Sequence, residues 1–197
     1  MLERLDQQLF LHLNSMHSPF WDWVMKTVSG IAIWIPLYLA ILLYLGFRFR
    51  KKFMVMLLFI ILAATLADQV SVQLFKNIFQ RLRPCHEPAI RDMVHLVDGR
   101  CGGLYGFISS HATNCFNVAL ISILFIRKRW FTVSILSWAV IISYSRIYLG
   151  VHYPGDVICG AAVGALIGWG IFELYSLTDR KILQHSEYFG SGITPAR

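Results

Sequence analysis

Long apolar runs separated by short charged segments restrict this chain to very few folds. The first run lies between Lys26 and Arg48, and its core, IAIWIPLYLAILLYLGF, can cross a hydrocarbon layer of about 30 Å. Four more runs follow, over residues 53–75, 109–126, 130–148 and 154–175. Because these runs are continuously apolar, they predict helices and not the alternating strands of a closed barrel.

The expected fold is therefore an all-α, polytopic transmembrane bundle with five spans. A sixth span before Ser29 is disfavoured, because it would carry four polar side chains into lipid: His12, His17, Asp22 and Lys26. Only 15% of the residues are charged, whereas soluble domains have roughly 25%. The length of 197 residues fits one domain and leaves no room for a separate soluble one.

Basic residues gather in three short segments between or after the apolar runs. These segments contain Arg48, Arg50, Lys51 and Lys52, then Arg127, Lys128 and Arg129, and finally Arg180 and Lys181. With five spans they all face one side, which the positive-inside rule makes cytoplasmic. The net charge of +7 could suggest nucleic acid, but that would need a basic soluble surface. We expect the lipid bilayer as a partner and no nucleic acid.

The first 28 residues are expected to form a helical segment that is retained, because Glu3 and Asp6 do not fit a cleavable signal peptide. Apolar residues at helical spacing predict an amphipathic helix, namely Leu2, Leu5, Leu9, Phe10 and Leu13. This helix could lie in the membrane interface or pack against the bundle. Residues 29–178 would form the membrane domain, and residues 179–197 a polar cytoplasmic tail.

Three polar clusters flank the apolar runs on the side opposite the basic segments. They are Lys76 with Arg83 and Pro84, then Ser109-Ser110-His111, then Ser145-Arg146 with His152 and Asp156. The predicted topology gathers all three on one extracytoplasmic face. Imidazole, carboxylate and cationic groups together are suited to binding a phosphate and transferring it through a phosphorylated histidine.

His152 and Asp156 are four residues apart, at the entrance to the fifth span. If the helix begins near Pro154, the Asp156 carboxylate can accept a hydrogen bond from one imidazole nitrogen of His152. The other nitrogen would then be free to attack phosphorus. The structural alternative is an aspartate that favours a helix N-terminus beside an interfacial histidine.

Ser109 and Ser110 open the third span, and His111 follows them. A serine at this position normally caps a helix. The free backbone N–H groups of the same turn also favour an anion, so His111 could lie beside a bound phosphate and protonate a departing oxygen.

Lys76, Arg83 and Arg146 lie on the face that is otherwise poor in cations. Such residues often extend toward the membrane interface. Arginine, however, binds phosphate oxygens bidentately and lysine acts as a point charge, so we expect all three to bind phosphate. The sequence contains no HExxH or CxxC motif and no acidic cluster suited to Mg²⁺, so the expected chemistry uses neither a metal nor a cofactor.

Cys85 and Cys101 both lie in the outer loop, where an oxidising compartment would permit a disulfide. Closing a loop of about 16 residues would contribute roughly 3 kcal/mol in the chain-entropy model. In the fifth span, a stripe of small residues allows another helix to approach closely: Gly160, Gly164 and Gly168. That helix could belong to the same chain or to a second copy, and the oligomeric state stays open.

The three clusters together resemble the signature of the type 2 phosphatidic acid phosphatase family, over roughly residues 50–175. The matching patterns are Lys76-x6-Arg83-Pro84, Ser109-Ser110-His111 and Ser145-Arg146-x5-His152-x3-Asp156. The resemblance implies a helical bundle with His152 as the nucleophile, Asp156 as its orienting partner and His111 as the general acid. It implies phosphate binding by Lys76, Arg83, Ser109, Arg146 and the backbone amide of Ser110.

Two positions depart from the usual second motif, Pro-Ser-Gly-His. Ile108 replaces the proline, which should matter little because that proline only stiffens the entry to the helix. Ser110 replaces the glycine and puts a side chain where the backbone approaches the phosphate. Either its hydroxyl joins the binding or the pocket is tighter.

The expected function is hydrolysis of a phosphate or diphosphate ester of a membrane lipid, at a periplasmic site in a bacterial inner membrane. From frequency in the family, the first expected substrate is undecaprenyl diphosphate and the second is a lipid A phosphate. Phosphatidylglycerol phosphate and phosphatidic acid come next. A phosphotransferase would share the first half-reaction, and a non-catalytic protein could use the cations to hold anionic headgroups.

Overall fold

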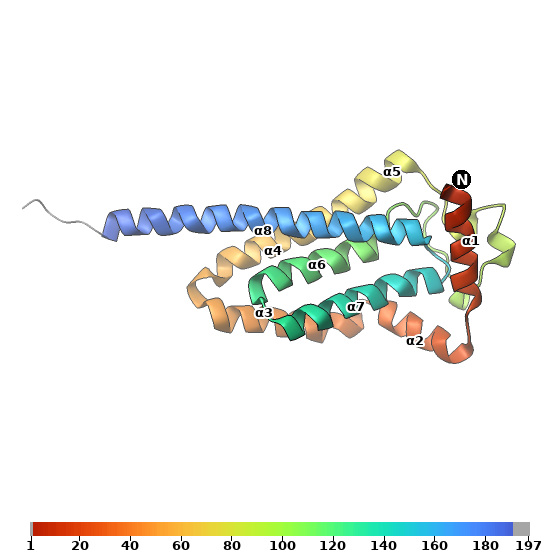
Figure 1. Cartoon of the computed structure of the whole chain (residues 1–197), viewed down its shortest axis with the longest axis horizontal. Helices are drawn as coiled ribbons and strands as arrows, with labels where there is room; N and C mark the ends of the chain where they lie inside the picture. Colours follow the sequence, from red (N-terminus) through yellow and green to blue (C-terminus); the bar gives the residue numbers. More distant parts are fainter. Residues whose placement is uncertain (1, 191–197) are drawn as a thin grey trace, which may run out of the picture.

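The computed structural model describes residues 2–190, which fold into a bundle of helices (Figure 1). The α-helices are α1 (Leu2–Ser15), α2 (Pro19–Ser29), α3 (Ile35–Phe49), α4 (Phe53–Gln69), α5 (Lys76–Phe79), α6 (Ser110–Ile126), α7 (Arg129–Tyr148) and α8 (Pro154–Gly190). Within these residues no strand forms, and one isolated β-bridge joins Leu82 to Tyr105. The predicted all-α class is confirmed.

Three helical stretches of the described chain are long and apolar enough to cross a membrane: Ala32–Phe79, Arg129–Tyr148 and Pro154–Arg180. The first, of 48 residues, reverses direction at Arg50, where φ is +35°, so α3 and α4 form two spans (Figure 1). Ser110–Ile126 is a shorter apolar helix. Together they give the five expected spans of a multi-pass membrane protein.

The N-terminal segment is divided into two helices and not one. Helix α1 lies across the end of the bundle, whereas α2 packs against α7 and leads into α3 (Figure 1). Phe10 of α1 is fully buried against the bundle, which is the packing alternative, while Leu2 is 83% and Leu5 55% exposed. Apolar side chains on the outer face of a helix that crosses the bundle end are suited to a membrane interface.

A single turn of π-helix, Val70–Phe75, connects α4 to α5. The wider turn changes the direction in which the following side chains point, and π-bulges are frequent at functional sites. Lys76 is the first residue after it, and α5 then ends at Gln80, whose φ is +45°.

Large apolar side chains cover the outside of the bundle as well as its core. Phe47 on α3 is 78% exposed, and Leu58 on α4 and Leu166 on α8 are each 64% exposed. In contrast, Leu45 on α3 and Met56 on α4 are fully buried. Exposed apolar surface of this extent is unusual for a soluble monomer but is required where helices face lipid.

Helices α6 and α8 are in direct backbone contact along the glycine stripe. A Cβ atom on Gly164 would overlap the Thr113 carbonyl oxygen, and one on Gly160 would lie 2.7 Å from the Ser109 carbonyl oxygen. The stripe is therefore filled by α6 of the same chain, which is the intramolecular alternative of the sequence analysis. This contact holds together the two helices that carry His111 and Asp156.

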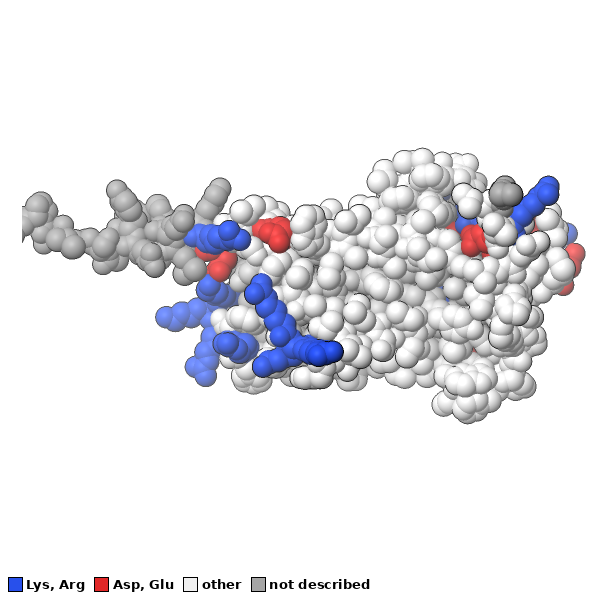
Figure 2. All heavy atoms as spheres, viewed as in Figure 1, with Lys and Arg blue, Asp and Glu red and all other residues white. Residues whose placement is uncertain are grey.

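Basic side chains gather at one end of the molecule, where Figure 2 shows a cluster in blue. Arg50, Lys51, Arg127 and Arg180 line one shared cavity there. Helix α8 continues past residue 179, where the tail was expected to begin, as far as Gly190. Residues 191–197 lie outside the described residues. The three polar clusters are at the opposite end, beside α1.

Candidate active site

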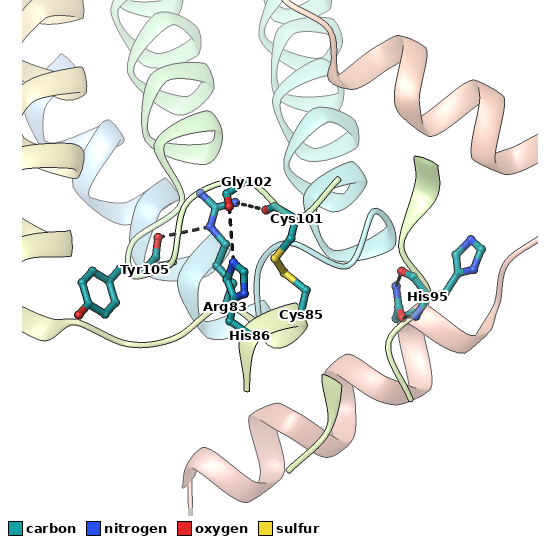
Figure 3. The surroundings of a disulfide bond; sticks show 8 residues. Arg83, Cys85, His86, His95, Cys101, Gly102 and Tyr105 are labelled. Atoms are coloured by element: carbon teal, nitrogen blue, oxygen red, sulfur yellow. Dashed lines mark hydrogen bonds between the residues drawn. A yellow bond between two sulfur atoms is a disulfide. The ribbon is translucent and has the colours of Figure 1, made fainter. Parts of the chain in front are cut away.

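The outer loop between α5 and α6 folds back on itself and presents Arg83. The backbone N–H of Arg83 donates to the Leu104 carbonyl at 3.1 Å, and that of Gly106 donates to the Arg81 carbonyl at 2.8 Å. A disulfide joins Cys85 to Cys101 beside this pairing, as the sequence suggested (Figure 3). The cross-link joins the segment directly after Arg83 to the segment whose carbonyl oxygens hold the Arg83 side chain.

The Arg83 side chain is buried and held by carbonyl oxygens of the same loop. Its Nε donates to the Tyr105 carbonyl at 3.3 Å and its Nη1 to the Cys101 carbonyl at 3.2 Å (Figure 3). Burial lowers the pKa of Arg83 from its ordinary value, although Asp156 counteracts this. The guanidinium stays charged at neutral pH, so the loop presents a fixed cation.

His152 and Asp156 meet at the start of α8, where the spacing predicted them. His152 Nδ1 lies 3.4 Å from Asp156 Oδ2, which is an ion-pair distance but longer than a regular hydrogen bond, and Nδ1 has no other partner among the described residues. The carboxylate itself is held more tightly, because Oδ2 accepts from the Tyr153 backbone N–H at 3.0 Å. Catalytic hydrogen bonds without bound substrate are often long in this way.

Burial keeps the His152 imidazole neutral. Its side chain is 2% exposed, and this desolvation lowers its pKa to about 4, with Arg83 and Arg146 adding to the effect and Asp156 opposing it. A neutral imidazole retains the lone pair that a nucleophile needs.

The first turn of α6 is tied to the first turn of α8. Ser109 caps α6, since its hydroxyl accepts from the Ala112 N–H at 3.5 Å, and its own N–H donates to the Asp156 carbonyl at 3.0 Å. His111 follows on this turn and lies within electrostatic range of Arg146 and His152. The second and third clusters are therefore brought together, as the topology predicted.

Several of the buried polar atoms that have no partner lie at this end of the bundle. Among the described residues these atoms include Ser110 Oγ, Arg146 Nε and His152 Nδ1. Buried polar groups are normally hydrogen-bonded, and a phosphate could accept from the first two. Another nitrogen of the Arg146 guanidinium, Nη1, donates to the Ser29 hydroxyl at the end of α2.

A cavity of about 380 Å³ opens beside these groups. Arg83 and Arg146 both line it, together with Ser29, Lys26 and Arg100. Lys76 is half-buried, lies within electrostatic range of Arg83 and Arg146, and has no ion-pair partner among the described residues. All eight sequence-predicted residues thus lie at one end of the bundle, where Arg83 and Arg146 line the same cavity.

Among the described residues, one group of three potential metal ligands is close together: Cys85, His86 and Cys101. Both sulfurs are bonded to each other, so this group offers one free ligand atom. His86 instead contacts the Gly102 carbonyl at 3.5 Å (Figure 3).

Three polar contacts at this end were not foreseen from the sequence. Arg81 and Asp6 form ion pairs at the site, and Ser29 holds Arg146. Arg81 lies between two motif residues, but its partner Asp6 is 75 positions away. No local spacing signal indicates such a contact.

Fold and site together define a class, namely integral membrane proteins that handle a phosphate group at one end of a helical bundle. A family model described as the PAP2 superfamily matches residues 53–180. The chain belongs to the PAP2 superfamily, and it is a membrane-embedded phosphatase of lipid phosphate esters. The resemblance seen in the sequence motifs is thereby confirmed.

Two relatives and one solved structure resemble most of the chain. A lipid A 4'-phosphatase of Bacteroides thetaiotaomicron is 44% identical over 184 residues, which cover 91% of this chain and 81% of that protein. A lipid A 4'-phosphatase of Porphyromonas gingivalis is 38% identical over 87% of this chain and 73% of its own length. The crystal structure of Aquifex aeolicus LpxE matches with a TM-score of 0.66 and 27% identity, over 84% of this chain and 93% of that one.

Proposed function

We propose that this protein removes the 4'-phosphate of lipid A through a phosphohistidine on His152. The observation that carries the mechanism is the buried His152–Asp156 pair beside unpartnered buried donors. The two relatives named for lipid A support the substrate. Undecaprenyl diphosphate, the first expectation from the sequence, becomes the second candidate, and phosphatidylglycerol phosphate and phosphatidic acid follow.

In the first step, the free imidazole nitrogen of His152 attacks phosphorus and the bond from phosphorus to the lipid oxygen breaks. His111 gives its proton to that leaving oxygen. Asp156 holds Nδ1–H and stabilises the positive charge that develops on the phosphorylated ring. Lys76, Arg83 and Arg146, with Ser109 and the Ser110 amide, bind the phosphate oxygens in place of a divalent cation. The Ser110 hydroxyl, which is buried and has no partner within residues 2–190, joins them.

In the second step, water attacks phosphorus and the phosphorus–nitrogen bond breaks, which returns a neutral His152. His111, now neutral, accepts the proton of the attacking water and is ready for another cycle. Inorganic phosphate is released. An acceptor hydroxyl in place of water would give phosphotransfer by the same route.

The cytoplasmic membrane of a bacterium, with the site on its outer face, is the proposed location. The separation of the two ends supports it, because the basic segments share a cavity at the end of the bundle away from His152. The positive-inside rule assigns that end to the cytoplasm.

The substrate proposal is tested by phosphate release from purified protein in detergent with a panel of four lipids. Each assay contains EDTA, because the proposed mechanism uses no metal ion. We expect release from the 4' position of bisphosphorylated lipid A, identified by mass spectrometry, with kcat/KM at least roughly tenfold above undecaprenyl diphosphate. Release of the 1-phosphate alone, preference for another lipid, or loss of activity in EDTA would each contradict part of the proposal.

The lowered pKa of His152 predicts activity that persists to unusually low pH. A group with pKa of about 4 is neutral, and nucleophilic, at all pH values above that, so kcat/KM should fall only as pH drops through about 4. A histidine with an ordinary pKa would lose activity below about 6.5. The pKa of the substrate's phosphate is measured separately by phosphorus NMR, and the pH profile of kcat/KM is corrected for it. An acid limb that remains near 6.5 after this correction would contradict a buried neutral nucleophile.

A further inference from the structure

Arg81 lies between two carboxylates at the edge of the proposed active site. Its Nη1 is 2.8 Å from Asp156 Oδ1, and its Nη2 is 2.8 Å from Asp6 Oδ2. The guanidinium also stacks over the Tyr153 ring, 4.1 Å from the ring centroid. With both nitrogens paired and one face covered, the side chain has little freedom to move.

Asp6 of the N-terminal helix contributes a second contact to the same region. Its Oδ1 accepts from the Gly155 backbone N–H at 2.8 Å, in the first turn of α8. A Cβ atom on Gly155 would lie 2.7 Å from Asp6 Oδ2, so only glycine permits this approach. Phe10, one turn along α1, is fully buried with its ring edge against Tyr153. Helix α1 is thus docked on the turn that carries Asp156.

We propose that Arg81 is a positioning residue for the His152–Asp156 pair and that Asp6 of the N-terminal helix holds Arg81 in place. The inference rests on the proposed role of His152. Asp156 is fully buried, and a buried carboxylate needs a compensating charge. Arg81 supplies that charge at Oδ1 and leaves Oδ2 for the Tyr153 N–H and His152. The carboxylate is thereby oriented toward the imidazole.

Arg81 acts through Asp156 and not on the substrate. Both of its terminal nitrogens are engaged by carboxylates, and its guanidinium lies over the Tyr153 ring. The cations that could reach a phosphate are therefore different residues. Partners that orient a ligating or catalytic group from behind typically change activity by roughly 10–100-fold when removed.

The charge of Arg81 also bears on the protonation of His152. The groups that face the pair are Arg81 and Arg83 from the outer loop, Asp6 from α1, Lys76 from α5, His111 from α6 and Arg146 from α7. Without Arg81, the negative charge of Asp156 is less compensated, so the pKa of His152 should rise. A rise makes His152 protonated, and inactive, at a higher pH than in the native protein.

The test compares Arg81→Gln, Arg81→Lys and the control Arg91→Gln, an exposed arginine of the same loop. We expect Arg81→Gln to lower kcat/KM by roughly 10–100-fold. It should also shift the acid limb of the pH profile of kcat/KM, where activity falls as His152 is protonated, to higher pH by about one unit. Arg81→Lys keeps the charge and should leave the limb near its native pH, and Arg91→Gln should change neither. A uniform loss of rate in Arg81→Gln with an unmoved limb would overturn the proposal, as would full activity.

The role of Asp6 is tested by Asp6→Ala alone and combined with Arg81→Gln, with Glu3→Gln as the control on an exposed carboxylate of α1. If Asp6 acts through Arg81, the double variant is no slower than Arg81→Gln. Additive losses would overturn this part. If Arg81→Gln does not fold, Asp6→Ala decides: it should lower kcat/KM because Arg81 loses the residue that holds it, and a native rate would overturn the proposal. Native protein that shows no His152-dependent hydrolysis would refute the proposed function itself, whereas an unaffected Arg81→Gln would refute this inference alone.

Discussion

His152→Ala should reduce kcat for lipid phosphate hydrolysis by at least roughly 10⁴-fold, because removing a covalent nucleophile eliminates the whole first step. The buried ring also packs at the start of α8, so a second variant, His152→Gln, keeps more of the volume. Both are measured by phosphate release in detergent, beside His12→Ala, which removes an exposed imidazole from α1. We expect His12→Ala to match the native rate.

The covalent intermediate gives a second measurement for the same residue. Lipid substrate labelled in its phosphate, quenched in alkali during turnover, should leave label on His152 in native protein and none in His152→Gln. A folded His152→Gln variant with near-native hydrolysis would eliminate the nucleophile assignment. Label on another residue would transfer the role to that residue.

His111→Ala should slow hydrolysis by roughly 10²–10⁴-fold, the usual contribution of a general acid. The sugar alkoxide of lipid A is a poor leaving group, so it depends on a proton at the moment of bond cleavage. With an aryl phosphate as substrate, whose leaving oxygen is far less basic, the same variant should lose much less of its kcat/KM. The measurement is therefore a ratio: the loss of kcat/KM with lipid A divided by the loss with an aryl phosphate.

A ratio well above one supports proton donation by His111. Equal losses with both substrates would instead show that His111 binds phosphate or supports the fold, because neither of those roles depends on the leaving group. Arg146→Gln provides the matched comparison, since it removes a proposed phosphate contact near His111 and should give equal losses with both substrates.

The spans could be predicted from the sequence because lipid leaves a polypeptide few choices. Continuous apolar runs must satisfy their own backbone groups, so residues 109–126 and 130–148 became α6 and α7 with boundaries close to those expected. The division of the N-terminal segment could not be predicted. Pro19 begins α2 and Ser18 caps it, but whether α2 lies in the interface or beside α7 depends on tertiary packing.

The sequence predicted that the candidate residues gather at one end of the bundle, but not which contacts hold them there. Spacing along one helix entrance brings His152 and Asp156 together, and chain topology brings both to α6. The sequence does not single out Asp6, Arg81 or Ser29, because a surface ion pair or a helix-capping serine is an ordinary local role for each of these residue types. Their contacts join positions 75 and 117 residues apart, and such pairings are set by folding and not by local pattern.

The contact of α6 with α8 along Gly160, Gly164 and Gly168 has a mechanical consequence. Two helices that touch backbone to backbone cannot slide or tilt independently without a clash. His111 on one and Asp156 on the other therefore travel as a single body when the surrounding lipid thins, thickens or curves. The proposed proton donor and the carboxylate that would orient the nucleophile would keep their separation across membranes of different composition, and lipid would affect entry of the substrate more than the bond-breaking step.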